Sequence, residues 1–366
     1  DQLLADTVGL GAPMSLLEQL DAFGPEEVVV ARDPDAGYTA LFVLHSTVLG
    51  PAVGGTRLRS YPSLEAALGD ALRLARGMTC KNALAGLPFG GGKSVILGPP
   101  PTDASARIEL FRAHGRAIER LGGRYMTGED VGTTTDDMAQ VARETAYVGG
   151  LDEGMGDPSP FTAYGVVRAM EAVAMRLWGS FDLSDRHVSI QGLGNVGMQL
   201  ARRLHARGAR LTVTDVVADR VTAAAREFGA DTCQPAAILD VGADLFAPCA
   251  LGGVLDDAAV DRLRVQAVCG GANNVLASPT AGVRLSERGI LYAPDYVANA
   301  GGVISGGVDL AGWDRARMQS ALDGVRATMA AVFDRAERES TTPETAADRM
   351  AEERLRDSAE RTRRGA

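Results

Sequence analysis

The sequence has few of the residues that hold metal ions or build disulfide frameworks. It contains four histidines and four cysteines in 366 residues, and neither set shows the short spacings of a metal site or of a small secreted domain. It also lacks any run of about 18 apolar residues, which argues against a membrane-spanning helix. We therefore expect no metal, no membrane and reduced thiols.

Positive charge is also scarce. The chain carries 37 Lys+Arg against 47 Asp+Glu, a net charge of −10, whereas a nucleic-acid binder presents a basic surface. DNA and RNA are therefore not expected as partners. The opening DQLLADTVGLGAP is acidic and lacks the basic start and long apolar centre of a signal peptide. These features favour a cytoplasmic protein in which residues 1–13 form a flexible extension.

The length indicates about two domains. Residues 149–160 are dense in Gly, Pro and Asp, which predicts a loop or hinge between them. We place the first domain at residues 14–150 and the second at 151–334. The charged helical tract that follows is broken at Thr342-Pro343, and we expect a helix over about 335–366 to return to the first domain.

Apolar periodicity predicts an α/β protein. In the first half, strands at 28–31 and 39–45 flank a turn, and helices follow at 64–77 and 106–121. In the second half, strands and helices alternate, which predicts a parallel, doubly wound sheet. The expected helices are 162–177, 196–207 and 220–228, and the expected strands are 187–191, 210–215, 244–247 and 265–269.

A GxGxxG motif directly follows the strand at 187–191 and opens a helix. Gly192 permits a tight turn, Gly194 lets the backbone approach a pyrophosphate, and Gly197 allows the helix to pack closely on the strand. Asp215 closes the next strand, where its carboxylate can bind ribose hydroxyls and repel a 2′-phosphate. The motif therefore predicts NAD in preference to NADP, with glycines that only turn the chain as the alternative.

Two lysines bracket a glycine-rich segment, Lys81 at its start and Lys93 at its end. The GGGKS string suggests a phosphate-binding loop, but that motif needs glycine at position 87, which is Leu87. The apolar run after Lys93 predicts that this lysine lies at the edge of a core. Burial and repulsion from Lys81 would lower the pKa of Lys93 and let it act as a base near neutral pH. Two ordinary surface lysines are the alternative.

Eight stretches carry a resemblance to a known family. They are LGPAVGGTR (49–57), DALRLARGMTCKN (70–82), LPFGGGKSVI (87–96), TGEDVGTT (127–134), QGLGNVG (191–197), FAPCALGG (246–253), GGANN (270–274) and ILYAPDYVANAGGVI (290–304). Together they resemble the leucine/phenylalanine/valine dehydrogenase branch of the glutamate dehydrogenase superfamily, in the same order across residues 14–356. One departure, the proline run at 99–101, lies beyond the lysine segment and touches no functional residue.

The resemblance implies two domains separated by a cleft, an N-terminal α/β domain for substrate binding and oligomerisation and a Rossmann-type NAD-binding domain. A homo-oligomer is therefore expected. In the family, the lysine matching Lys81 binds the substrate carboxylate, the lysine matching Lys93 activates the water that attacks the imine, and the acid matching Asp130 exchanges protons with the amino group. The backbone at Gly54 and Gly55 approaches the carboxylate. The cofactor set comprises Gly192, Gly194, Asn195, Val196, Gly197, Asp215, Cys249, Ala250 and Asn274, the last of which also contacts substrate.

The expected reaction passes the Cα hydride of an L-amino acid to NAD, and water then releases the 2-oxo acid and ammonia. The resemblance places Val53, Gly128, Val303 and Gly306 around the substrate side chain. None is charged, which disfavours glutamate and favours an apolar substrate. The two glycines enlarge this region and favour phenylalanine or another aromatic, with a leucine or valine enzyme as the alternative.

Two other classes of function remain to be weighed. One is an NAD-binding sensor that has lost catalysis, against which Lys81, Lys93 and Asp130 argue. The other is a nucleotide triphosphatase that uses GGGKS, against which the missing glycine argues.

Overall fold

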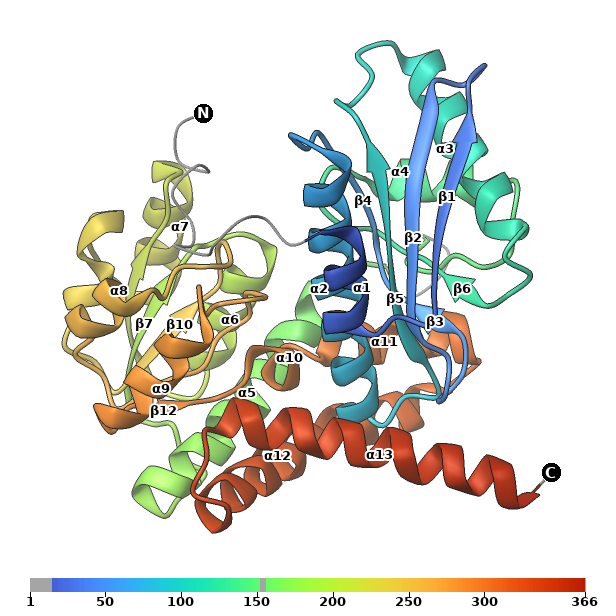
Figure 1. Ribbon diagram of the computed structural model, residues 1–366. Helices are drawn as coiled ribbons and strands as arrows, with labels where there is room; N and C mark the ends of the chain where they lie inside the picture. Colours follow the sequence, from blue (N-terminus) through green and yellow to red (C-terminus); the bar gives the residue numbers. More distant parts are fainter. Residues whose placement is uncertain (1–14, 152–155, 366) are drawn as a thin grey trace.

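A computed structural model describes residues 15–151 and 156–365, so the predicted extension at 1–13 lies outside the described residues. The chain forms two six-stranded sheets that lie side by side, with long helices beneath them (Figure 1). Within the described ranges, no helix is long and apolar enough to cross a membrane.

The first sheet is mixed, with the order β1-β2-β5-β3-β6 and β4 beside β5. The predicted strands at 28–31 and 39–45 form an antiparallel hairpin, as expected. Parallel pairing joins β3 and β4 to β5. The strands are β1 (Glu27–Asp33), β2 (Tyr38–Ser46), β3 (Ala52–Val53), β4 (Thr56–Arg59), β5 (Gly90–Leu97) and β6 (Tyr125–Met126).

Helices cover both faces of this sheet, because successive side chains of a strand point to opposite faces. In β2, Leu41 and Val43 pack toward α2 (Leu64–Leu84), whereas Phe42 packs toward α3 (Ala104–Glu119). The short helix α1 (Leu16–Phe23) lies against α2, and α4 (Thr135–Val141) lies against α3.

One boundary prediction in this half is wrong, and one strand was not predicted. The helix expected to end at Gly77 continues to Leu84, because packing against β5 and the last helix offsets the roughly 1 kcal/mol cost of an interior glycine. The glycine-rich segment before Lys93, which the sequence pattern did not assign to a strand, is the start of β5. A Cβ on Gly91 would lie 2.1 Å from the backbone nitrogen of Thr79, so glycine lets α2 press against the strand. GGGKS therefore lies inside a strand and does not form a phosphate-binding loop.

The second sheet is fully parallel, with the order β12-β11-β10-β7-β8-β9. This confirms the doubly wound sheet, whose strand order reverses between β7 and β10. Its strands are β7 (His187–Gln191), β8 (Arg210–Thr214), β9 (Asp231–Thr232), β10 (Leu245–Pro248), β11 (Ala267–Val268) and β12 (Leu291–Tyr292). Its helices are α6 (Asn195–His205), α7 (Ala218–Phe228), α8 (Asp257–Arg262) and α9 (Pro279–Glu287), with a 3-10 turn, η1, at Pro235–Asp240.

Five further helices lie beneath and between the sheets (Figure 1). They are α5 (Ser159–Trp178), α10 (Asp295–Ala298), α11 (Gly301–Ala311), α12 (Arg315–Arg338) and α13 (Pro343–Gly365). The last helix, α13, packs on α2 and α12, whereas α12 packs on α5. The helix that returns to α2 of the first half, α13, thus begins at Pro343, and the assignment of residues from about 335 to the first domain stays a prediction. The domain division at 149–160 stays a prediction.

A buried network of polar side chains joins helix α3 to the first sheet. His114 is fully buried, and its Nδ1 lies 2.8 Å from the Tyr38 hydroxyl while its Nε2 lies 2.8 Å from Thr56 Oγ1. Thr56 Oγ1 also lies 2.7 Å from Thr127 Oγ1, and the ring stacks on Phe42 with centroids 5.2 Å apart. Burial lowers the pKa of His114 to about 3. The neutral imidazole therefore ties α3 to β2, β4 and the segment after β6.

This network predicts acid sensitivity. The folded-state pKa of His114 lies below the ordinary value of 6.5, so its stabilising contribution is complete above pH 6.5 and is lost as the pH falls toward about 3. The free energy of unfolding should fall by up to about 1.4 kcal/mol per pH unit in that window from this group. Denaturant unfolding between pH 7 and 4 should show a shallower pH slope for His114→Gln, and an unchanged slope for His205→Gln at an exposed position. Equal slopes for the His114 variant and the wild type would contradict this assignment.

Candidate active site

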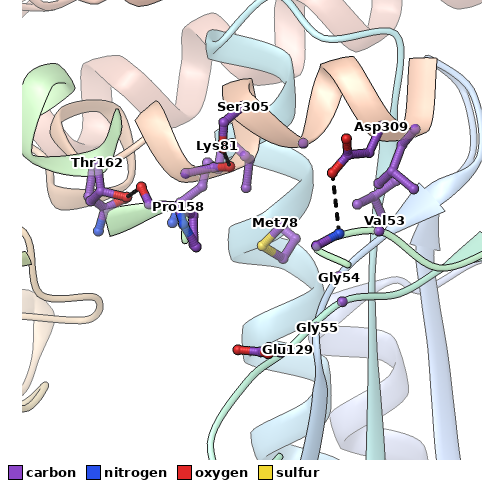
Figure 2. Close-up of a pocket in the computed structure, with 18 of the residues that line it drawn as sticks. Val53, Gly54, Gly55, Met78, Lys81, Glu129, Pro158, Thr162, Ser305 and Asp309 are labelled. Atoms are coloured by element: carbon purple, nitrogen blue, oxygen red, sulfur yellow. Dashed lines mark hydrogen bonds between the residues drawn. The ribbon is translucent and has the colours of Figure 1, made fainter. Parts of the chain in front are cut away.

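A cleft of about 570 Å³ lies between the two sheets. The first half contributes the turn after β3, with Gly54 and Gly55, and one face of α2, with Met78 and Lys81 (Figure 2). The second half contributes residues from the start of α6, the turn at 271–273 and helix α11. The structure thus brings the predicted substrate and cofactor segments to one cavity.

Lys93 and Asp130 form a buried ion pair beside this cleft. Lys93 Nζ lies 2.9 Å from Asp130 Oδ2, and the lysine side chain is 5% exposed. The pair lies directly behind the lining, because a Cβ on Gly55 would come within 3.0 Å of Asp130 Cβ. The structure therefore places the two predicted catalytic side chains together, against the predicted carboxylate-binding backbone.

Electrostatics at this pair differ in one respect from the prediction. Burial lowers the pKa of Lys93, as expected, and the charge of Asp130 opposes that shift. Arg57 is a further cation that lowers the pKa of Lys93, and the repulsion between the two lysines lowers the pKa of Lys81. Burial would raise the pKa of Asp130, but Lys93 and Arg57 outweigh it and hold that pKa below its ordinary value.

Lys81 lies on helix α2, which packs against the strand that carries Lys93, and its side chain lines the cleft. Its Nζ donates to Asn273 Oδ1 at 2.9 Å, and Asn299 Nδ2 donates to the same oxygen at 2.8 Å. Burial lowers the pKa of Lys81 to about 8, with Asp295 opposing and Lys93 adding to the shift. A cation at this position can receive a carboxylate.

The structure separates the two asparagines of the turn at 273–274, of which Asn274 was predicted to contact cofactor and substrate. Both side chains are exposed, but Asn273 is in the lining of the cleft and Asn274 is not. Asn274 has a φ of 52°, a left-handed conformation that asparagine tolerates, and its carbonyl accepts from Gly253 N at 2.7 Å. It therefore shapes the turn, and Asn273 is the residue that reaches Lys81.

The glycine-rich turn has the geometry of a dinucleotide site. Gly192 has a φ of 94°, and a Cβ on Gly197 would lie 1.9 Å from Gly192 O. Nothing lies within 4 Å of the Cβ position of Gly194, so the space above the start of α6 is open. Asn195 and Val196 line the cleft from this helix. A pyrophosphate fits this open helix N-terminus, whose free amides carry partial positive charge.

The neighbouring segments complete this site. Asp215 is held at the turn, where its carboxylate accepts from Leu193 N at 2.6 Å and from Val217 N at 2.8 Å. Cys249 N donates to Gln191 O at 2.7 Å, and Ala250 packs against Gly192. Arg220, which the sequence analysis did not single out, lies 3.7 Å from Asp215. Arg220 is the third residue of α7, so a search limited to the residue directly after Asp215 does not find it.

All four residues predicted around the substrate side chain line the cleft, Val53, Gly128, Val303 and Gly306. Neither glycine has a positive φ. A Cβ on Gly306 would meet nothing within 4 Å, and one on Gly128 would meet only Gly149 O, at 3.5 Å. The backbone therefore does not require glycine at either position, and the missing side chains leave space in the cleft.

Several lining residues escaped the sequence analysis. Met78, Phe89 and Leu310 add apolar surface, and Asp309 adds a carboxylate that accepts from Gly150 N at 3.4 Å (Figure 2). Asn82 and Asn299 each have a buried side-chain oxygen with no hydrogen-bond partner among the described residues. These two oxygens therefore have unused capacity to accept a hydrogen bond. Across residues 15–151 and 156–365, no cluster of His, Cys, Asp and Glu could hold a metal ion.

Comparison with known proteins identifies this arrangement. The family model "Glu/Leu/Phe/Val dehydrogenase, dimerisation domain" matches residues 25–147, and "Glutamate/Leucine/Phenylalanine/Valine dehydrogenase" matches residues 154–219 and 212–363. The chain belongs to this family. It is an amino-acid dehydrogenase with the family's two-domain α/β fold.

Relatives within the family differ in substrate. The leucine dehydrogenase of Geobacillus stearothermophilus is 47% identical over 93% of this chain and 94% of its own length. The valine dehydrogenase of Streptomyces coelicolor is 47% identical over 94% and 97%. The crystal structure of L-tryptophan dehydrogenase from Nostoc punctiforme superposes with a TM-score of 0.83 at 39% identity, covering 94% of this chain and 99% of that one.

Proposed function

We propose that this dehydrogenase catalyses the NAD-dependent, reversible oxidative deamination of an apolar L-amino acid to its 2-oxo acid and ammonia. The observation that carries the proposal is the buried pair Lys93 and Asp130, which lies directly behind the lining of the cleft that Lys81 and the start of α6 border. A non-catalytic NAD-binding protein would have no use for a buried lysine with a lowered pKa next to a substrate-sized cavity.

Each charged group has a separate task in this proposal. Lys81 binds the substrate carboxylate, exchanging its contact with Asn273 for one with the ligand. Asp130 accepts a proton from the substrate amino group, and Lys93 removes a proton from the water that attacks the imino acid. Residues 192–197, Asp215, Cys249, Ala250 and Asn274 would hold NAD, which would accept the hydride. Reductive amination uses the same groups in reverse.

The side-chain region supports an apolar substrate and leaves its size open between two candidates. The space at Gly128 and Gly306 favours a phenylalanine-sized or other aromatic side chain. The leucine and valine dehydrogenases among the relatives favour a branched-chain substrate. Initial rates of NADH formation with Phe, Trp, Leu, Val and Glu at equal concentrations decide between them, and a preference for Glu would overturn the apolar assignment.

The cofactor choice is tested in the same assay. Asp215 would repel a 2′-phosphate, so kcat/KM should be higher with NAD than with NADP. Comparable efficiency with both cofactors would overturn the NAD assignment, and Arg220, beside Asp215, would then be the candidate to bind the 2′-phosphate.

Filling the open position in α11 should change substrate preference. Gly306→Val should lower kcat/KM for the largest accepted side chain by about 10- to 200-fold relative to valine, which corresponds to about 1–3 kcal/mol of lost fit. Gly77→Ala is a matched control, because Gly77 is also helical with open space at its Cβ position but lies outside the cleft lining. A uniform loss with all substrates in Gly306→Val would contradict a role in size selection.

We also propose a cytoplasmic homo-oligomer. The support is the family model over residues 25–147, which is described as a dimerisation domain. Light scattering on the purified chain gives the assembly size, and a monomer at micromolar concentration would oppose the proposal.

A further inference from the structure

One carboxylate oxygen of Asp130 forms ion pairs with two basic side chains. Lys93 Nζ lies 2.9 Å from Asp130 Oδ2, and Arg57 Nε lies 2.8 Å from the same atom. Arg57 lies on β4 opposite Val95 of β5, and Lys93 lies two residues before Val95, so both basic side chains extend from the same face of the sheet. The carboxylate is therefore held from two adjacent strands.

Arg57 is itself fixed by a second carboxylate. Its Nη1 donates to Asp70 Oδ2 at 2.8 Å, and the Tyr61 hydroxyl donates to the same oxygen at 2.6 Å. Asp70 lies on α2, the helix that also carries Lys81. The Arg57 side chain is 14% exposed, so its charge acts with little screening by solvent. The guanidinium thus links the loop that carries Asp130 to the helix that carries Lys81.

We propose that Arg57 is a positioning residue for Asp130, holding its carboxylate ionised and oriented toward the substrate amino group through a bridge to Asp70. The planar guanidinium can direct Nε to one carboxylate and Nη1 to another at once, which a single lysine ammonium on a shorter, flexible stem does less well. The proposal rests on the proposed role of Asp130 in proton exchange.

The charges around Asp130 set the direction of the expected effect. The groups that face it are Lys93 on β5, Arg57 on β4, Lys81 on α2 and Tyr125 on β6, with Asp70 behind Arg57. Burial raises the pKa of Asp130, whereas the charges of Lys93 and Arg57 lower it. Removing the charge of Arg57 should therefore raise this pKa. The acidic limb of the pH profile of kcat/KM should then move to higher pH.

The test compares Arg57→Gln, Arg57→Lys and Asp70→Asn with the full-length wild type, using NADH formation from its best amino acid. Arg57→Gln should lower kcat by roughly 10- to 100-fold, as expected for a misplaced catalytic group. Its acidic limb should shift upward by about one pH unit. Arg57→Lys should restore the position of the limb but only part of kcat. Asp70→Asn should lower kcat by a smaller factor with little shift of the limb.

Arg73→Ala is the matched control, because Arg73 also contacts Asp70, at 3.3 Å, but is exposed and does not touch Asp130. It should leave kcat and the pH profile unchanged. An Arg57→Gln protein with wild-type kcat and pH profile would overturn the proposal, as would a loss of thermal stability with an unmoved limb. Should Arg57→Gln not fold, wild-type kcat in both Arg57→Lys and Asp70→Asn overturns it. Asp130→Asn distinguishes a failure of the role proposed for Arg57 from a failure of the role proposed for Asp130, since full activity in this variant would refute the role of Asp130.

Discussion

Replacing Lys93 with alanine should lower kcat for oxidative deamination by about 10²- to 10⁴-fold, the range that a positioned general acid or base contributes. The side chain is buried, its pKa is lowered by burial, and it contacts Asp130 at 2.9 Å. The only other lysine in the chain, Lys81, is already engaged with Asn273 and is assigned to the substrate carboxylate, so we do not expect it to replace Lys93. Asp130 would keep Arg57 as a partner, so we expect the fold to survive.

Rate measurements at saturating amino acid and NAD check this expectation, with thermal unfolding as the control for folding. Chemical rescue makes the test sharper. A small primary amine can occupy the space left by the lysine stem and act as a base, so methylamine or ethylamine should restore part of kcat in Lys93→Ala and none in Lys81→Met. Near-native turnover in Lys93→Ala would show that another group activates the water.

The second sheet was the more predictable half of the fold. Its strand, glycine-rich turn and helix are specified by residues close together in the sequence, so the pattern at 187–197 was enough to place β7 and α6. The missed strands, Asp231–Thr232 and Leu291–Tyr292, have two residues each. Segments this short exist only because neighbouring strands pair with them, and they show no periodicity of their own.

The first sheet was less predictable because long-range packing decides its boundaries. Gly77 marks a helix end by local preference, yet α2 continues for two more turns between β5 and α13. That extension puts Lys81 on a rigid helix instead of a loop. Likewise, the glycines before Lys93 resembled part of a phosphate-binding loop, but they form a strand that accommodates the backbone of α2.

The site was predicted in its motifs and missed in its supporting contacts. Lys81, Lys93 and Asp130 came from a resemblance that covers both domains, whereas Arg57 and Asn273 became evident only from distances. Both of these lie beside residues that were singled out, in GGTR and ANN. One signal in the sequence was available and unused. A chain that uses arginine for every other permanent positive side chain, yet retains lysine at 81 and 93, points to chemistry that needs an amine with an adjustable pKa.

Lys81→Met should weaken binding of a simple carboxylate inhibitor by roughly 10²-fold, because it removes one partner of a buried, charge-assisted contact. A substrate analogue without an amino group, such as 4-methylpentanoate or 3-phenylpropanoate, isolates this contact from proton exchange at Asp130. Lys81→Arg keeps the charge and is the matched control. It should bind the inhibitor more tightly than Lys81→Met, though less well than the wild type, since Asn273 Oδ1, which also accepts from Asn299, is positioned for a compact ammonium group.

The pH dependence of this inhibitor gives the same assignment a second, independent test. The pKa of Lys81 is about 8, because burial outweighs the attraction of Asp295, and the inhibitor carboxylate is ionised throughout the neutral and alkaline range. Below pH 8 lysine and inhibitor carry opposite charges. Above it the lysine loses its proton, so the inhibition constant should rise about tenfold per pH unit. With only two lysines, 13C labelling at Cε gives two side-chain signals, and the one absent from Lys81→Met reports this titration directly. An inhibition constant that stays flat from pH 7 to 10, with a Lys81 signal that titrates near 8, would show that the carboxylate binds elsewhere in the cleft.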